Sequence, residues 1–257
     1  MRLQSFFSGP LHILKTYLKD QPWKRNYERS VLWSFTDKGI KFLAELLIGF
    51  YLAVSLGVGK FGLLNYAISF VVLFQGISTV GLTDLLTREF VNRKDEAEKI
   101  VSAALSMRLP VSIFFAVVIN LIAWQEEPTV RQLIFAISLS LIFRSFEVFI
   151  YYFQSIIRAE WVAKIQIVVT FLISILKIVL ITIKSDVTAF AWAYSIEWFL
   201  IAVGLLITYL KLKPMHKWRT TWPPIKRLFI ESWPLMISSI AASFSKLYSS
   251  YSINRWH

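Results

Sequence analysis

Apolar residues dominate this chain in six consecutive stretches of 19 to 27 residues, separated by short polar connections. The stretches cover residues 31–56, 61–82, 100–124, 131–157, 165–183 and 188–210. A helix needs about 20 mostly apolar residues to cross a bilayer core of roughly 30 Å. We therefore predict an all-α integral membrane protein with six complete transmembrane helices, followed by the start of a seventh at Trp233.

The connections between these stretches alternate between strongly basic and nearly uncharged. Residues 1–30, 83–99, 158–164 and 211–232 together carry eighteen lysines and arginines, whereas the alternate connections carry only Lys60 and Lys184. Because basic loops are retained in the cytoplasm, we predict a cytoplasmic N-terminus and a cytoplasmic 211–232 segment. The net charge of +12 therefore reflects topology and contact with anionic membrane lipids, and it does not indicate a nucleic-acid partner.

This pattern divides the chain into four parts. We expect a basic cytoplasmic tail at 1–30, a six-helix transmembrane lobe at 31–210, a basic cytoplasmic linker at 211–232, and an incomplete seventh helix with an aberrant tail at 233–257. The apolar run that opens at Trp233 lasts only about 12 residues, which is too short to span a bilayer. We therefore expect that a premature stop or a frameshift produced this ending.

Two local patterns add detail to the first hairpin and to the connection after it. Six of the nine glycines fall between residues 49 and 81, and we expect their missing side chains to let two helices approach closely. Residues 83–99 mix charges of both signs around an apolar stripe that includes Leu85, Leu86 and Phe90. This stripe predicts an amphipathic helix on the cytoplasmic side.

The most informative residues are ionisable side chains inside the apolar stretches. They are Lys38, Lys41, Glu45, Arg108, Arg144, Glu147, Lys177 and Glu197. A charge at the bilayer centre costs about 2.5 to 3.5 kcal/mol, so eight lipid-facing charges would cost on the order of 20 kcal/mol. We therefore expect them to face a polar cavity or one another. Five cations against three carboxylates leave that interior net positive, which suits an anionic substrate.

Structural explanations remain open beside the functional ones. Arg144 and Glu147 are three residues apart and could form an intrahelical ion pair that only allows the helix to insert. Lys38 lies near the inner interface, where snorkelling explains it better than substrate contact. For the remaining charges near mid-depth, a functional and a structural role are equally consistent with the sequence.

Several catalytic classes are excluded or disfavoured. The chain has no cysteine, so disulfides, thiolate metal sites and cysteine nucleophiles are ruled out. The three histidines, His12, His216 and His257, lie in tails or in the linker and form no catalytic constellation. The acids at 84–98 are interleaved with basic residues and lack the Asp-x-x-Asp spacing of a metal–diphosphate site. We predict neither an enzyme nor a cofactor.

Separated motifs in this chain resemble bacterial polysaccharide flippases of the O-antigen transporter type, in the multidrug, oligosaccharidyl-lipid and polysaccharide exporter superfamily. The motifs are Gly59-Lys60-Phe61-Gly62-Leu63-Leu64-Asn65-Tyr66, Gly81-Leu82, Arg88-Glu89, Glu147-Val148-Phe149, Tyr152-Phe153-Gln154, Arg158-Ala159, Ser232-Trp233-Pro234-Leu235 and Ser238-Ser239. The resemblance covers nearly all of residues 30–243. The tail at 249–257 resembles nothing in that family.

The resemblance implies one lobe of a two-lobe protein of roughly 12 to 14 helices that works by alternating access. It implies transport of undecaprenyl-pyrophosphate-linked oligosaccharide across the bacterial inner membrane, with a polysaccharide polymerase and a chain-length regulator as further partners. Substrate contact then falls to the cations Arg144, Lys177, Arg108 and Lys41. Coupling to protons or sodium falls to the carboxylates Glu45, Glu147 and Glu197.

Two other functions remain as alternatives. A drug or organic-ion exporter of the same superfamily would need an acidic cavity for hydrophobic cations, and the net positive interior argues against it. A purely structural membrane subunit would leave the eight intramembrane charges without an explanation. If the chain ends within its fold, we expect a membrane-inserted product that does not transport, because one lobe holds half of a site between two.

Overall fold

The computed structural model describes residues 22–78 and 82–213, and within these residues it contains helices and no strands. The helices are α2 (Pro22–Ser78), α3 (Leu82–Asn92), α4 (Ala97–Ile122), α5 (Pro128–Arg144), α6 (Val148–Ser155), α7 (Ala159–Thr182) and α8 (Val187–Leu212), with short 3-10 turns at Lys94–Glu96, Ala123–Gln125 and Ser145–Glu147. The predicted all-α membrane architecture is confirmed. Most of the 1–30 tail, nearly all of the linker and the seventh helix lie outside the described residues.

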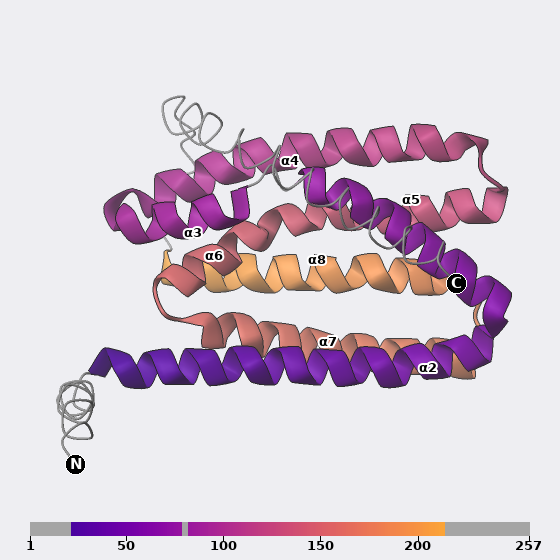
Figure 1. Ribbon diagram of the computed structural model, residues 1–257, viewed down its shortest axis with the longest axis horizontal. Helices are drawn as coiled ribbons and strands as arrows, with labels where there is room; N and C mark the ends of the chain where they lie inside the picture. Colours follow the sequence, from indigo (N-terminus) through magenta and orange to yellow (C-terminus); the bar gives the residue numbers. More distant parts are fainter. Residues whose placement is uncertain (1–21, 79–81, 214–257) are drawn as a thin grey trace, which may run out of the picture.

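Helix α2 contains the first two predicted spans, which are joined by a kink. Its apolar part, Val31–Gly76, is 46 residues long, which would extend about 70 Å as a straight helix, more than twice a bilayer core. At Gly57 the backbone leaves the helical region with φ of +75°, a conformation that favours glycine. Figure 1 shows α2 bending there and running back across the bundle. We call residues 22–56 the first arm and 58–78 the second arm.

Within residues 22–78 and 82–213, five helices are long and apolar enough to cross a membrane: Val31–Gly76, Ala97–Gln125, Pro128–Ser155, Ala159–Thr182 and Val187–Leu212. With α2 counted as two arms, they correspond in order to the six predicted spans; six separate crossings remain a prediction. Large apolar side chains such as Phe35, Phe50 and Phe171 are exposed on the bundle surface. Such a surface suits lipid, since a water-soluble protein rarely exposes extended apolar patches.

The bundle packs around α8. Helix α8 lies between α5 and α7, and the first arm of α2 runs beside α7 (Figure 1). Two apolar cores fill the interior. One lies at the α3–α6 end and contains Phe90, Phe149 and Tyr209, and the other lies toward the bend of α2 and contains Leu64 and Ile134. The candidate site described below lies among these same helices.

Contacts between connections show which of them share an end of the bundle. Lys60 Nζ lies 2.9 Å from Asp186 Oδ1, and Tyr66 Oη lies 3.2 Å from Glu126 Oε1. The bend of α2 therefore meets the α7–α8 turn, and the second arm just after the bend meets the α4–α5 turn. These three connections are the ones that carry few basic residues. At the other end, Lys213 Nζ lies 3.0 Å from Glu98 Oε1. The alternation of basic and weakly charged connections in the sequence thus corresponds to the two ends of the fold.

The predicted helix within 83–99 is present as α3. Its apolar stripe of Leu85, Leu86 and Phe90 is buried against the bundle, while Arg88 is exposed. Burial of this stripe explains why a segment with so many charges forms an ordered helix beside the spans.

The prediction for the glycines was wrong where the structure describes their surroundings. A Cβ placed on Gly49, Gly57, Gly59 or Gly62 would meet no atom within 4 Å, so these glycines do not mark close helix contacts. The physical reason is where these glycines lie: Gly57, Gly59 and Gly62 are on the exposed side of the bend, and Gly49 borders a cavity. Close approach occurs instead at Gly204, where an added Cβ would lie 2.7 Å from Cγ2 of Ile165.

The fourth predicted span is interrupted. Residues 131–157 were expected to form one helix, but α5 ends at Arg144, a 3-10 turn covers Ser145–Glu147, and α6 follows from Val148 to Ser155. The interruption coincides with a buried hydrogen bond from Ser145 Oγ to Ser112 Oγ of 2.9 Å. It also coincides with the Arg144–Glu147 pair, so the charged residues of this span lie at its break.

Candidate functional site

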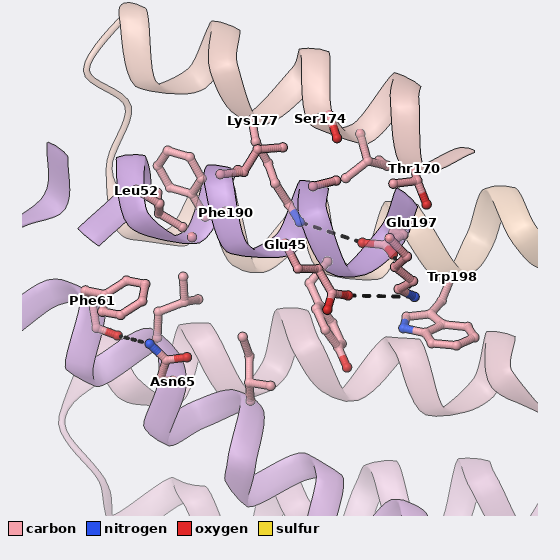
Figure 2. Close-up of a pocket in the computed structure, with 18 of the residues that line it drawn as sticks. Glu45, Leu52, Phe61, Asn65, Thr170, Ser174, Lys177, Phe190, Glu197 and Trp198 are labelled. Atoms are coloured by element: carbon pink, nitrogen blue, oxygen red, sulfur yellow. Dashed lines mark hydrogen bonds and ion pairs between the residues drawn. The ribbon is translucent and has the colours of Figure 1, made fainter. Parts of the chain in front are cut away.

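A cavity of about 630 Å³ lies among α2, α5, α7 and α8. It is lined by both arms of α2, by the last residue of α5, and by the facing sides of α7 and α8 (Figure 2). Its charged lining consists of three cations, Lys41, Arg144 and Lys177, and two carboxylates, Glu45 and Glu197. All five residues were predicted from the sequence as intramembrane charges. The structure brings them together from four helices.

Glu197 of α8 lies between two lysines from different helices. Its Oε1 is 3.5 Å from Nζ of Lys41 on α2, and its Oε2 is 3.7 Å from Nζ of Lys177 on α7. Lys41 also lies 3.9 Å from Oε1 of Glu45, four residues along the same helix. Figure 2 shows Lys177 and Glu197 pointing toward each other across the cavity. These separations are those of ion pairs rather than short hydrogen bonds.

Arg144 belongs to both the cavity and a second ion-pair cluster. Its Nη2 lies 3.1 Å from Glu147 Oε1, and Arg108 Nη2 of α4 lies 3.5 Å from Glu147 Oε2. The intrahelical pair considered from the sequence is therefore present. Arg144 nevertheless also lines the cavity, so insertion of the helix need not be its whole role.

Arg108 and Glu147 do not line the cavity. The side chain of Arg108 is only 2% exposed and Glu147 is largely buried. The intramembrane charges were expected to face a polar cavity or one another, and Arg108 does the second, because α4 directs it toward the break between α5 and α6. There it pairs with Glu147, behind Arg144.

Trp198 completes the cavity and was not predicted from the sequence. The Arg144 guanidinium carbon lies 3.7 Å from the centre of the Trp198 ring, and Lys41 Nζ lies 5.4 Å from it. Both distances are in the range of cation–π contacts. One aromatic ring thus contacts two cations from different helices. Trp198 directly follows Glu197 in the sequence, and this adjacency to an intramembrane charge is the signal that could have identified it as a cavity residue.

Unsatisfied hydrogen-bond donors lie in this region. Within the described part of the chain, Nε of Arg144 and Nη1 of Arg108 are buried and have no hydrogen-bond partner. The guanidinium of Arg144, which lines the cavity, can bind an anionic oxygen. No group of three His, Asp or Glu residues in the described part of the chain could hold a metal ion.

The remaining lining is mixed in character. Asn65 and Tyr194 add polar atoms, and Leu52, Phe61 and Phe190 add apolar and aromatic surface. The Asn65 amide donates to the backbone carbonyl of Phe61, one turn earlier in the same arm of α2, at 2.9 Å (Figure 2). The cavity can therefore hold a charged group beside apolar or sugar-like surface.

Comparison with protein families gives one match. The family described as polysaccharide biosynthesis protein matches residues 28–256. The match extends to residue 256, so the expectation that the 249–257 tail resembles nothing in the family was wrong. No curated protein and no solved structure gives a significant match. Because the matched region covers most of the chain, the protein belongs to the polysaccharide biosynthesis protein family.

Proposed function

We propose that this protein moves undecaprenyl-pyrophosphate-linked oligosaccharide repeat units across the bacterial inner membrane for O-antigen or related polysaccharide synthesis. The family supports a role in polysaccharide biosynthesis or transport. The observation that carries the finer proposal is the cavity, in which Lys41, Arg144 and Lys177 converge from three helices within the membrane-spanning bundle. A diphosphate offers the acceptor oxygens that such cations bind.

The ion pairs suggest how binding is coupled to an ion gradient. A diphosphate that contacts Lys41 and Lys177 would compete with Glu197 for both cations. A carboxylate that loses both partners inside the membrane is costly unless it takes up a proton or a sodium ion. In this proposal the substrate takes over the lysine partners of Glu197 and Glu45, and the two carboxylates then bind the coupling ion instead. Glu147 instead holds Arg144 in place, with Arg108 behind it.

The proposal gives the other partners and the membrane orientation as well. The N-terminus lies in the cytoplasm, where the precursor is assembled, and the bend of α2 faces the opposite side. Polysaccharide polymerase and a chain-length regulator act on the exported unit. Transport of a lipid-linked precursor is not an enzymatic reaction, so no catalytic residue is assigned.

Binding of undecaprenyl diphosphate to the purified protein, measured by native mass spectrometry, tests this proposal. We expect Arg144→Ala to abolish binding and Arg144→Lys to restore part of it, because lysine keeps the charge but loses the planar two-point geometry. Arg131→Ala is the matched control, since Arg131 lies in the first turn of the same helix, stacks on Trp124 and lies outside the cavity. Undecaprenol, which lacks the diphosphate, should bind weakly to every variant.

Two results would contradict the proposal. Unchanged binding by Arg144→Ala would reduce that residue to an insertion partner of Glu147. Displacement of the diphosphate by a hydrophobic organic cation with higher affinity would favour the exporter alternative. Production of surface polysaccharide by each variant, in a strain that lacks its own flippase, then compares binding with transport at equal expression.

A further inference from the structure

A second cavity, of about 580 Å³, lies at the end of the bundle where α2 bends. The end of the first arm, Lys60 and the α7–α8 turn surround it. Its lining residues are Tyr51, Val54, Ser55, Leu56, Lys60, Ile181, Lys184 and Ser185. It therefore contains both lysines that the weakly charged connections carry. The sequence separates these lysines by more than a hundred residues, and the fold brings them to one cavity.

This cavity has a net charge of one positive unit. Lys60 Nζ is held by Asp186 Oδ1 at 2.9 Å, so these two charges offset each other. Lys184 is exposed, and in the part of the chain that the structure describes its side chain forms no ion pair. A ligand with a single negative charge would complete the balance.

The backbone at Lys184 gives an independent indication of function. Its φ of +52° is left-handed, and the amide of Ser185 donates to the Leu180 carbonyl at 2.9 Å. This arrangement ends a helix in the manner usually reserved for glycine. Lys184 therefore has a backbone cost that glycine would remove, and functional sites are among the places where such costs occur.

The other lining residues indicate an amphiphilic ligand. The hydroxyl groups of Tyr51, Ser55 and Ser185 can donate to phosphate oxygens. Val54 is exposed toward the outside of the bundle, and Leu56 and Ile181 add apolar wall. The cavity lies at the end of the spans, at the level of lipid headgroups.

We propose that this cavity binds the phosphodiester headgroup of a membrane phospholipid, with Lys184 as its counter-charge and the apolar wall against its acyl chain. The single negative charge of a phosphodiester matches the single net positive charge of the cavity. This site is separate from the cavity of the transport proposal and does not depend on it.

Native mass spectrometry of the full chain with phosphatidylglycerol measures this binding. Lys184→Ala should weaken the first lipid adduct about fivefold, the effect of one lysine near a membrane surface, and Lys184→Arg should retain it. Lys184→Gly should lose the same affinity while its Tm rises, because glycine relieves the left-handed backbone. This opposite change separates a lost ligand from a damaged fold. Diacylglycerol, which lacks the phosphate, should bind all variants equally.

The matched control is Lys211→Ala, which removes one exposed lysine near the opposite end of α8. Equal weakening by Lys211→Ala would show a general surface-charge effect and would overturn the site. Unchanged binding by Lys184→Ala would overturn it as well. Displacement of the lipid by inorganic phosphate, but not by chloride at the same ionic strength, would identify free phosphate as the ligand and overturn the lipid assignment.

Discussion

At the scale of single residues, the strongest structural constraint is the buried charge of Arg108. It is fully enclosed, and Glu147 is its ion-pair partner on the neighbouring element at 3.5 Å. Glu147 also holds Arg144 at 3.1 Å. Removing the shared carboxylate therefore leaves two cations within the bundle, one of them without access to solvent. Loss of one partner from a buried pair is much more costly than loss of an exposed one.

We expect Glu147→Leu to lower the free energy of unfolding by about 3 to 5 kcal/mol. The measurement is thermal unfolding in detergent, followed by tryptophan fluorescence. Glu126→Leu serves as the control, because Glu126 is exposed and its carboxylate accepts a hydrogen bond from the Tyr66 hydroxyl at 3.2 Å; its effect should stay within about 0.5 kcal/mol. Similar small effects from both substitutions would mean that Arg108 does not depend on Glu147.

Besides Lys184, a residue in the turn between α6 and α7 has a strained backbone. Ile157 has a φ of +56°, which is unfavourable for a β-branched residue. We expect Ile157→Gly to raise the free energy of unfolding by about 0.5 to 1 kcal/mol, since relief of the left-handed conformation exceeds the entropy cost of glycine.

Ile156 provides a closely matched control for that substitution. Ile156 and Ile157 are both 38% exposed, but Ile156 has a φ of −94°. Ile156→Gly should therefore lower the Tm while Ile157→Gly raises it, as measured by differential scanning fluorimetry. A fall of the Tm in both variants would show that side-chain packing dominates over backbone strain in this turn.

At the scale of elements, one ion pair ties the bend of α2 to the turn between α7 and α8. The hydrogen bond from Lys60 is the main cause that lowers the pKa of Asp186, and a backbone bond from Val187 adds to it. A carboxylate with a lowered pKa stabilises the fold at pH values above its ordinary value of 3.8. That contribution is lost as the pH falls through the lowered folded value.

We expect the Tm difference between the natural protein and Asp186→Asn to be constant near neutral pH and to shrink in the acid range below the ordinary pKa. The pair is largely exposed, so its full contribution should be below about 1 kcal/mol. Unfolding curves at a series of pH values measure the difference. A difference that grows on acidification would contradict the sign of this argument.

At the scale of the whole molecule, we predict that the two ends of the bundle face opposite sides of the membrane. Because the chain has no cysteine, single cysteines can be labelled without background. Val58, at the bend of α2, is 91% exposed, and Asn92, at the end of α3, is exposed at the other end of the bundle. In intact cells a membrane-impermeant maleimide should label Val58→Cys and should label Asn92→Cys only after permeabilisation. The reverse pattern would invert the predicted orientation.

The sequence allowed the secondary structure and the set of intramembrane charges to be predicted, because both depend on local composition. A run of about 20 apolar residues is helical in a membrane whatever its neighbours, since its backbone must satisfy its own hydrogen bonds. The same reasoning identified Lys41, Arg144, Lys177 and Glu197 as residues that must avoid lipid. It could not place the break at Ser145–Glu147, because that break depends on contacts with α4.

Tertiary structure decided which charges share a cavity. Arg108 and Lys177 look alike in the sequence, as isolated cations in apolar spans, yet Arg108 is enclosed beside Glu147 and Lys177 lines the cavity. Trp198 acquires a role only because α8 places its ring against Arg144 of α5. Lys60 and Lys184 share a second cavity only because α2 bends toward the α7–α8 turn. Periodicity and hydropathy are local properties, whereas the partner of a charge is set by helices distant in sequence.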